Sequence, residues 1–349
     1  MAYNTIAFNE FVDNVERTVI EQIKDAKPNM VRGLFRSVPW NQGDGEKVTF
    51  NSVCLSGFAP RVVENDNYTA VNPAKGNELS KTQLQFGDKL EITRRMMKFN
   101  DRYANAKFDA QALVKRLMNS LDIEMTMQAF AEADQTTFTP LGQSSTHNIA
   151  TSDAKAVAAT DHSYGGITFS NVLNDATQAG GLGPVLSVGN YAAAEKQMTQ
   201  NTPDDFGTYI APSPNAILIA NEPTMKMKCH QMFGSSLTPE SGNNALNPLM
   251  ALGGDSVQVY CLKYGDRTPT GAVNSTASTS NQYRWAVLDT DMTSRAWQLM
   301  MAEEPTPEQR FTDSDNLLAK ILVTQFAAYG IVQPQGSLYS LSITKPTLS

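Results

Sequence analysis

The most constraining feature of this chain is a polar strand-pair pattern that leads into a long helix pattern. Residues 46–98 hold two strand-like runs, and the segment from Asp101 to Thr139 contains neither glycine nor proline. An isolated two-stranded ribbon is at best marginally stable in water. We therefore expect the apolar face of this strand pair to rest on another molecule, which favours a building block over a catalyst.

The two strand-like runs are residues 46–56 and 82–93. In the second run, Leu84, Phe86, Leu90 and Ile92 alternate with polar residues, which is typical of a strand with one apolar face. The stretch between the runs is rich in asparagine and too irregular for a tight turn. The pattern predicts a long two-stranded projection with a loose tip.

The helix that follows has one continuous apolar stripe and is expected from about residue 105 to 133. At ~1.5 Å per residue this helix would be ~43 Å long. A long core helix of an ordinary α+β protein would show the same pattern. The stripe consists of Ala110, Leu113, Leu117, Leu121, Met125 and Ala129, widened by Val114 and Met118.

The N-terminal region predicts a helix followed by an arm. Residues 8–27 carry apolar side chains, among them Phe8, Phe11 and Val15, at three- and four-residue spacing, and Pro28 ends the run. Residues 29–45 carry Leu34, Phe35 and Trp40 without a period. Such an arm needs a partner surface, which either its own domain or a neighbouring molecule could supply.

The rest of the chain predicts a mixed α+β region with a strand-rich end. Residues 135–165 and 264–283 are expected to be polar loops. Leu317–Val332 is ambiguous by periodicity, although Tyr329-Gly330-Ile331-Val332 favours a strand. The expected helices are Asn171–Ala179, Ala192–Thr199 and 221–233, and the expected strands are Ala216–Ala220, Val257–Leu262, Trp285–Leu288 and Ala296–Met301.

Composition limits the function classes. The 349 residues suffice for about two domains, and the net charge of -7 argues against a protein that binds nucleic acid or anionic membranes. Cys54, Cys229 and Cys261 are widely spaced, which argues against a disulfide scaffold and for a reducing compartment. No apolar run approaches the length of a membrane span, and no secretory signal is recognisable. We expect the chain to fold in a cytoplasm.

No motif for catalysis, cofactor binding or metal binding is present. The phosphate-loop and nucleophile-elbow patterns do not occur, and His147, His162 and His230 are not spaced as metal ligands. Two carboxylate pairs remain, Asp289 with Asp291 and Asp313 with Asp315. Surface or turn carboxylates explain both pairs, so we expect no cofactor, no metal and no enzyme activity.

The order of these parts resembles the major capsid protein of tailed bacteriophages, which has the Hong Kong 97-type fold. The resemblance covers nearly the whole chain and is carried by three segments together. They are LEITRRMMKFNDRYANAKFDAQALVKRLMNSLD, AILIANEPTMKMKCHQMF, and WAVLDTDMTSRAWQLMMAEEP with NLLAKILVTQFAAYGIVQPQGSLYSL.

The resemblance implies a division of the α+β chain into the parts of a capsid subunit. Residues 1–45 would be the N-terminal arm and residues 46–98 the extended two-stranded loop. Residues 99–200 and 302–349 would form the peripheral domain with its spine helix, and residues 201–301 the axial domain. Leu317–Val332 would be a long strand of the peripheral domain.

The implied function is self-assembly into hexamers and pentamers of an icosahedral shell around phage double-stranded DNA. The chain would assemble in the host cytoplasm and reside in the virion. Its partners would be its own copies, with scaffolding, portal and decoration proteins possible, DNA contacted non-specifically at most, and no membrane. The candidate subunit-interface residues are Phe8, Phe11, Val15, Leu34, Phe35, Trp40, Leu84, Phe86, Leu90 and Ile92.

Two departures from the family pattern affect these expectations. Some relatives carry a long N-terminal assembly domain that is later removed, whereas here the arm begins almost at once, which suggests a separate scaffolding protein or none. Some relatives also cross-link a loop lysine to an asparagine of a neighbour. Lys75 and Lys81 lie in the corresponding region, but lysine is common in loop tips and we do not assign that chemistry.

Three alternatives remain open at this stage. A cellular nanocompartment protein (encapsulin) of the same fold would have nearly the same sequence pattern. An enzyme could use one of the two carboxylate pairs. Another phage structural part, such as a tail or fibre protein, is disfavoured because fibres rarely contain one long, single-stripe helix in mid-chain.

Overall fold

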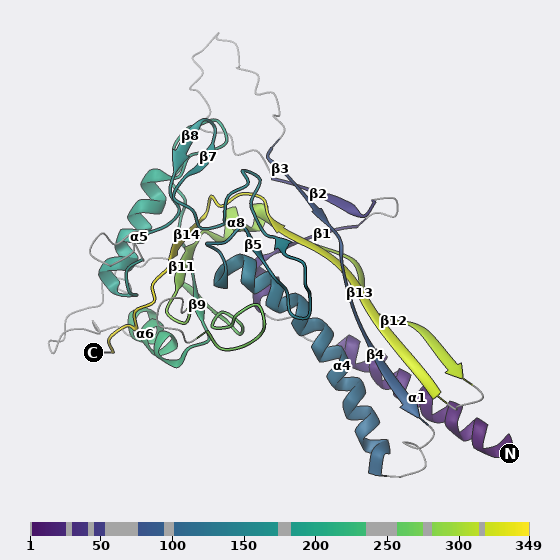
Figure 1. Ribbon diagram of the computed structural model, residues 1–349. Coiled ribbons are helices and arrows are strands. Elements are labelled where there is room, and N and C mark those ends of the chain that lie inside the picture. Colours follow the sequence, from purple (N-terminus) through teal and green to yellow (C-terminus); the bar gives the residue numbers. More distant parts are fainter. Residues whose placement is uncertain are drawn as a thin grey trace, which may run out of the picture.

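The computed structural model describes residues 2–25, 30–40, 45–52, 76–93, 101–173, 183–234, 257–274, 281–313 and 318–348. These residues form a compact body and a long projection from it (Figure 1). We call the projection the blade; it consists of α1 (Ala2–Asp25), most of α4 (Asp101–Thr126), β4 (Leu84–Thr93) and the outer parts of β12 (Trp297–Asp313) and β13 (Leu318–Ile331). The α+β class expected from the sequence is confirmed.

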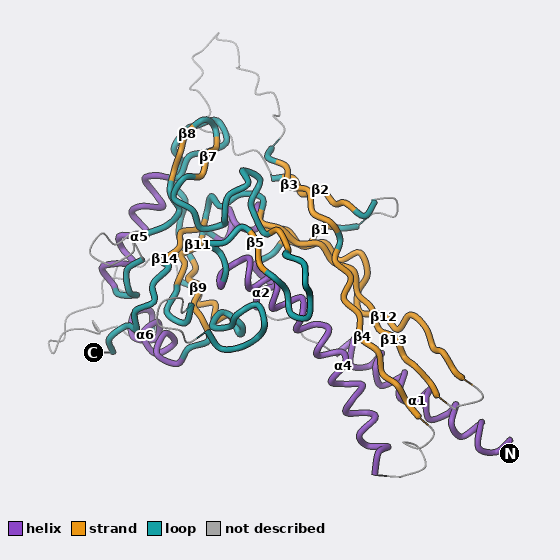
Figure 2. The backbone as a smooth tube through the Cα atoms, viewed as in Figure 1, coloured by secondary structure: helices purple, strands orange, loops and turns teal. Residues whose placement is uncertain are grey.

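The sheet of the blade has the order β1-β12-β13-β4, where β1 is Arg36–Val38. The short β1 runs parallel to β12, and the other two pairings are antiparallel. Both helices pack against the same face of this sheet, as the tube in Figure 2 allows the reader to follow. The apolar cluster between the layers contains Val12, Val15 and Val19 of α1, Leu113, Val114 and Leu117 of α4, Ile92 of β4, and Ala319, Ile321 and Val323 of β13.

The body is built on a second sheet with the order β10-β9-β11-β14. Helices α5 (Val188–Asn201) and α6 (Pro223–Phe233) pack on one face, and the C-terminal end of α4, continued by the π-helix η1 (Met127–Ala131), packs on the other. Ser187 caps α5 and Glu222 caps α6, each by accepting a backbone N–H bond. The strands are β9 (Ala216–Ala220), β10 (Gln258–Leu262), β11 (Trp285–Leu288) and β14 (Ser337–Ser340).

Smaller elements complete the described chain. Helix α2 (Met30–Leu34) lies against α4, and α8 (Thr290–Ala296) leads directly into β12. Two short hairpins are β5 (Thr137–Phe138) with β6 (His147–Asn148), and β7 (His162–Tyr164) with β8 (Ile167–Phe169).

The ribbon of β2 (Lys47–Asn51) and β3 (Glu78–Thr82) lies over the part of the blade sheet nearest the body. Its apolar side chains Val48, Phe50 and Leu79 pack on β12 and β13. Gly330 permits this close approach, since a Cβ atom there would lie 2.9 Å from Leu79 Cδ2 and 3.3 Å from Phe50 Cδ2. The ribbon therefore rests on its own chain, which corrects the expectation that another molecule covers it.

The predicted pairing of residues 46–56 with residues 82–93 is also wrong. Residues 84–93 form β4, which pairs antiparallel with β13, while β2 pairs with β3. The alternation of Leu84, Phe86, Leu90 and Ile92 correctly indicates one apolar face. It carries no information about which distant strand lies beside it.

Two further predictions are corrected. Residues 135–165 are not a surface loop, because Phe138, Ile149, Val157 and Tyr164 are buried. Asn171–Leu173 is not helical, and Val172 instead forms an isolated bridge with Tyr339; the remainder of that predicted helix, residues 174–179, lies outside the described residues.

The other predicted helices and strands are confirmed with changes of length, whereas Met30–Leu34 of the predicted arm form the helix α2. The spine helix predicted at 105–133 is α4 with η1, and the segment 317–332 is the strand β13. The strand predicted at Ala296–Met301 is much longer, since β12 extends to Asp313. No helix in the described ranges is both long enough and apolar enough to cross a membrane.

Candidate assembly surfaces

The blade has an open edge along β4. In the order β1-β12-β13-β4 this ten-residue strand has no partner strand on its outer side within the described residues. The free edge of a sheet presents backbone N–H and C=O groups to which another chain can pair. The edge of β4 is therefore a surface on which a second molecule could add a strand.

The outer face of the blade sheet carries polar side chains on β4, beside the half-buried Leu322 and Phe326 of β13. Beyond the β2–β3 ribbon, no element among the described residues covers it, and Gln85, Lys89 and Glu91 are exposed. Glu91 Oε1 lies 3.1 Å from Lys89 Nζ and 3.5 Å from Lys320 Nζ. The hydrogen bond and the charge of Lys89 lower the pKa of Glu91. The β4 side of this face can therefore make polar contacts.

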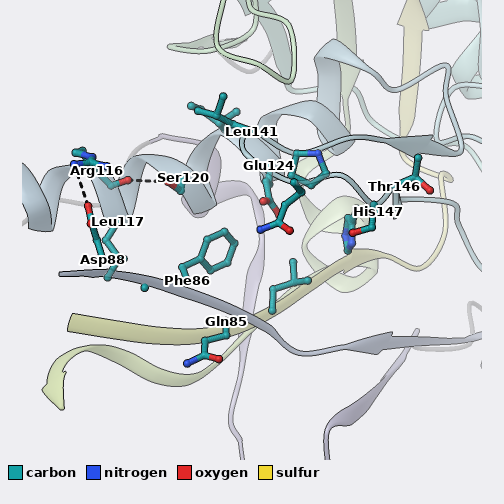
Figure 3. A pocket seen from close by; sticks show the side chains of 16 residues that line it. Gln85, Phe86, Asp88, Arg116, Leu117, Ser120, Glu124, Leu141, Thr146 and His147 are labelled. Atoms are coloured by element: carbon teal, nitrogen blue, oxygen red, sulfur yellow. Dashed lines mark hydrogen bonds and ion pairs between the residues drawn. The ribbon is translucent and has the colours of Figure 1, made fainter. Parts of the chain in front are cut away.

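A groove runs beside the open edge, between β4, α4 and the loop at residues 140–147 (Figure 3). Its volume is about 450 Å³. Arg116 Nη1 and Asp88 Oδ2 form an ion pair of 3.2 Å at one end, and Leu141, which is 61% exposed, lines the groove on the side of the loop.

Glu124 is the chemically unusual residue of this groove. Its Oε2 accepts a hydrogen bond of 3.1 Å from the Tyr329 hydroxyl. Burial raises the pKa of Glu124 to about 7 despite that bond. The nearby carboxyl group raises the pKa of Tyr329 further above the level that burial alone gives, so the phenol stays protonated and remains a donor.

The half-buried His147 lies at the other end of the groove (Figure 3). The His147 ring packs beside the Tyr329 ring, with centroids 5.6 Å apart. Burial, followed by the charge of Lys81, lowers the pKa of His147 to about 4, so the imidazole is neutral at physiological pH. Its buried Nε2 atom has no hydrogen-bond partner among the described residues.

Lys81 ties the β2–β3 ribbon to the body. Its Nζ donates to the carbonyl oxygens of Asn148, at 2.7 Å, and Ala150, at 3.3 Å. Burial lowers the pKa of Lys81 to about 8. This lysine is thus bound within its own chain, while Lys75, the other lysine noted in the sequence, lies outside the described residues.

The predicted interface residues do not form one open surface. Eight of them have described side chains, and these pack within the chain. Val15 and Ile92 are buried between the layers of the blade, Leu34 and Phe35 belong to the central core, and Trp40, Leu84, Phe86 and Leu90 are partly buried. The side chains of Phe8 and Phe11 lie outside the described set. An apolar pattern does not distinguish a core contact from a contact with a neighbour. The expectation that a neighbour covers them is therefore corrected for the residues buried in their own chain, which are Val15, Leu34, Phe35 and Ile92.

The Asp289–Asp291 pair does not form a site. Asp289 caps α8, where its carboxylate accepts from the backbone N–H groups of Asp291 and Met292, and it also accepts from Ser213 N at 2.9 Å. The side chains of Asp313 and Asp315 lie outside the described set. Among the described residues, no group of three or more histidine, cysteine, aspartate or glutamate side chains could hold a metal ion.

The histidines also have structural surroundings. His162 is fully buried, and its Nδ1 lies 2.8 Å from Asp153 Oδ2. Burial raises the pKa of Asp153, but hydrogen bonds from His162 and Thr151 outweigh it, and the pKa is lowered to about 2. This pair holds the 151–164 segment together and does not open into the groove described above.

Sequence reasoning missed Glu124 and the open edge. A signal for Glu124 was available, because it follows Leu117 by seven residues and Leu121 by three, at the margin of the apolar stripe. A carboxylate at such a position faces the covered side of a helix. The open edge had no signal, since it depends on the pairing of β4 with β13.

Comparisons with known proteins give structural neighbours only. No protein-family model and no curated protein matches the sequence. The capsid of Myoviridae phage XM1 aligns with a TM-score of 0.49 at 10% identity, covering 89% of this chain and 90% of that chain. The capsid of cyanophage P-SCSP1u aligns with a TM-score of 0.49 at 12% identity, covering 88% and 85%.

A virus-like particle from Pyrococcus furiosus aligns with a TM-score of 0.42 at 8% identity, covering 94% of this chain and 98% of that chain. The likeness thus extends along most of the chain.

Proposed function

We propose that this chain is the subunit of a closed icosahedral shell, the major capsid protein of a tailed bacteriophage. The observation that carries the proposal is the blade, a two-layer projection with an open sheet edge along β4, an uncovered outer face and a groove beside that edge. Such a projection adds little to the core of its own body. It is suited to spanning from one subunit to the next.

The parts take the following roles in the proposal. Residues 1–45 form the arm and 46–98 the extended loop, residues 99–200 and 302–349 form the peripheral domain, and residues 201–301 form the axial domain around the five- and six-fold axes. Hexamers and pentamers of one chain build the shell. The packing of α4 on β12 and β13 keeps the conformation of each subunit the same in slightly different environments. The chain acts as a structural protein of the virion and not as an enzyme, and it is assembled in the host cytoplasm. It contacts the packaged double-stranded DNA non-specifically at most, in keeping with its net charge of -7.

Expression of the full chain followed by sedimentation and negative-stain microscopy tests the proposal. Regular hollow particles, or rings of five and six subunits, are expected. A species that stays at the mass of one chain at all concentrations would contradict it.

The contents of the particles test the viral assignment. Particles recovered from the native source are expected to hold nuclease-protected double-stranded DNA. Particles that hold a protein cargo and no DNA would instead identify the nanocompartment alternative.

A further inference from the structure

The groove lies beside the open edge of β4, on the side of the sheet that α4 covers. Residues Leu84 to Asp88 of β4 line it. Phe86 points toward α4, whereas Gln85 points to the other side of the strand, because the side chains of a strand alternate between its faces (Figure 3). Since β4 is the outermost strand of this sheet among the described residues, the groove adjoins an edge where an extended segment could pair with the backbone.

The floor of the groove holds a carboxyl group without a counter-charge. Within the described part of the chain, the only hydrogen bond to the side chain of Glu124 comes from Tyr329, and no charged neighbour perturbs it. The basic groups nearby are otherwise engaged. Arg116 is paired with Asp88, Lys81 donates to two carbonyl oxygens, and His147 is neutral. A half-buried carboxylate without a counter-charge is stabilised by an incoming cation.

We propose that this groove receives an extended segment of a second copy of the chain, which adds along β4 and places a lysine or arginine side chain against Glu124. The inference rests on the proposed function and specifies one contact between subunits. Strand addition supplies backbone hydrogen bonds, and the pocket for one side chain supplies register. Charge complementarity identifies the inserted side chain as a cation.

The contact has a predictable pH dependence. Tyr329 from β13 contacts Glu124. The titratable and charged groups that line the groove with Glu124 are His147 from β6 and the Arg116–Asp88 pair from α4 and β4. Burial raises the pKa of Glu124 to about 7 in the free groove, and an inserted cation should return it toward 4.5. Because the bound state holds the ionised carboxylate, association should strengthen as the pH rises to 7.5.

These two pKa values set the size of the effect. With one proton released per contact, the association constant should increase about twentyfold between pH 5.5 and pH 7.5. This range stays below the titration of Lys81, whose pKa is about 8, and above that of His147, whose pKa is about 4.

The experiment measures, by sedimentation, the protein concentration at half-assembly from pH 5.5 to pH 7.5 for the full chain and two variants. Glu124→Gln keeps the shape and the bond from Tyr329 but cannot ionise, so its assembly should be weak and nearly independent of pH. Glu132→Gln is the matched control. Glu132 is a half-buried glutamate whose pKa is also raised by burial, but it lies outside the groove and near Arg284. It should keep the pH dependence of the unchanged chain.

A second readout locates the contact. Hydrogen exchange of residues 84–88 should slow when the unchanged chain assembles, and should slow less in Glu124→Gln at equal concentration. Thermal unfolding of both variants checks that each is folded.

The outcomes separate this inference from the proposed function. Assembly of Glu124→Gln with the same pH dependence as the unchanged chain, or unaltered exchange of residues 84–88 on assembly, overturns the inference and leaves the shell proposal intact. An unchanged chain that never associates overturns both.

Discussion

Replacement of Arg32 by methionine tests whether the segment after α1 is held by its own chain. Arg32 Nε donates to Asp122 Oδ1 at 2.5 Å, and its Nη2 donates to the carbonyl oxygen of Met118 at 3.0 Å. The Arg32 and Asp122 side chains are only 11% and 5% exposed. Methionine keeps much of the apolar stem but removes the charge, which leaves a buried carboxylate without its cation. Removal of one partner of a buried pair costs about 3–5 kcal/mol.

The pH dependence of this cost has a definite sign. Burial raises the pKa of Asp122 above its usual 3.8, and the charge of Arg32 opposes that rise. Without Arg32 the pKa should rise further. The folded state then binds a proton more tightly than the unfolded state, so stability falls as the pH rises through the window above 3.8. The loss caused by Arg32→Met should therefore be larger at pH 8 than at pH 5.

Urea unfolding of the unassembled subunit at both pH values measures this loss. Asp122→Asn in the Arg32→Met background removes the stranded charge and should recover part of the stability at pH 8. A loss below about 1 kcal/mol that is equal at both pH values is what an exposed ion pair would give. That result would refute the docking of α2 on α4.

Three further predictions concern the core, the ribbon and the groove. Trp297 is fully buried, so Trp297→Ala should lower the free energy of unfolding by about 3–5 kcal/mol; unchanged thermal unfolding would contradict this placement. Gly330→Ala would set a Cβ atom 2.9 Å from Leu79 Cδ2. The variant should lower the free energy of unfolding by about 1–3 kcal/mol and should speed hydrogen exchange in the β2–β3 ribbon. Unaltered exchange in the ribbon would count against the contact. Because the folded-state pKa of Glu124, about 7, lies above its value of 4.5 in an unfolded chain, the unassembled subunit should lose up to about 3 kcal/mol of stability as the pH rises from 4.5 through 7. The same pH series on Glu124→Gln should lack this loss, and an identical profile for both proteins would disprove it.

The elements with strong local signals could be predicted from the sequence. The unbroken run with one apolar stripe locates α4 with η1 to within a few residues. The apolar run Ala216–Ala220 and the helix after Pro223 are correct for the same reason, since burial on both faces and proline at a helix start are read from neighbouring residues. The α+β class follows from these elements.

The pairing of distant segments could not be predicted. Strand β4 pairs with β13, which begins more than two hundred residues later in the chain, and the pattern of Leu84 to Ile92 is equally compatible with a partner strand nearby. For the same reason the buried residues in 135–165 were missed. Their polar neighbours resemble a loop, whereas Phe138 and Ile149 are covered by η1.

The candidate site was only partly predictable. Leu84 and Phe86 are predicted interface residues, and both line the groove. That prediction rests on the apolar face of their strand, and this face packs against the chain itself. The position of Glu124 beside the helix stripe was readable. Its raised pKa was not, because it results from the layers that α4, β13 and the 140–147 loop form together.

Electron microscopy of the purified full chain across a range of concentrations tests the central claim most directly. If copies of this chain bind one another through their blades, closed hollow particles or rings of five and six subunits should form, either from this chain alone or with a scaffolding protein supplied. Dispersed particles of the size of a single 38.1 kDa chain at every concentration, with the edge of β4 open to hydrogen exchange throughout, would contradict it.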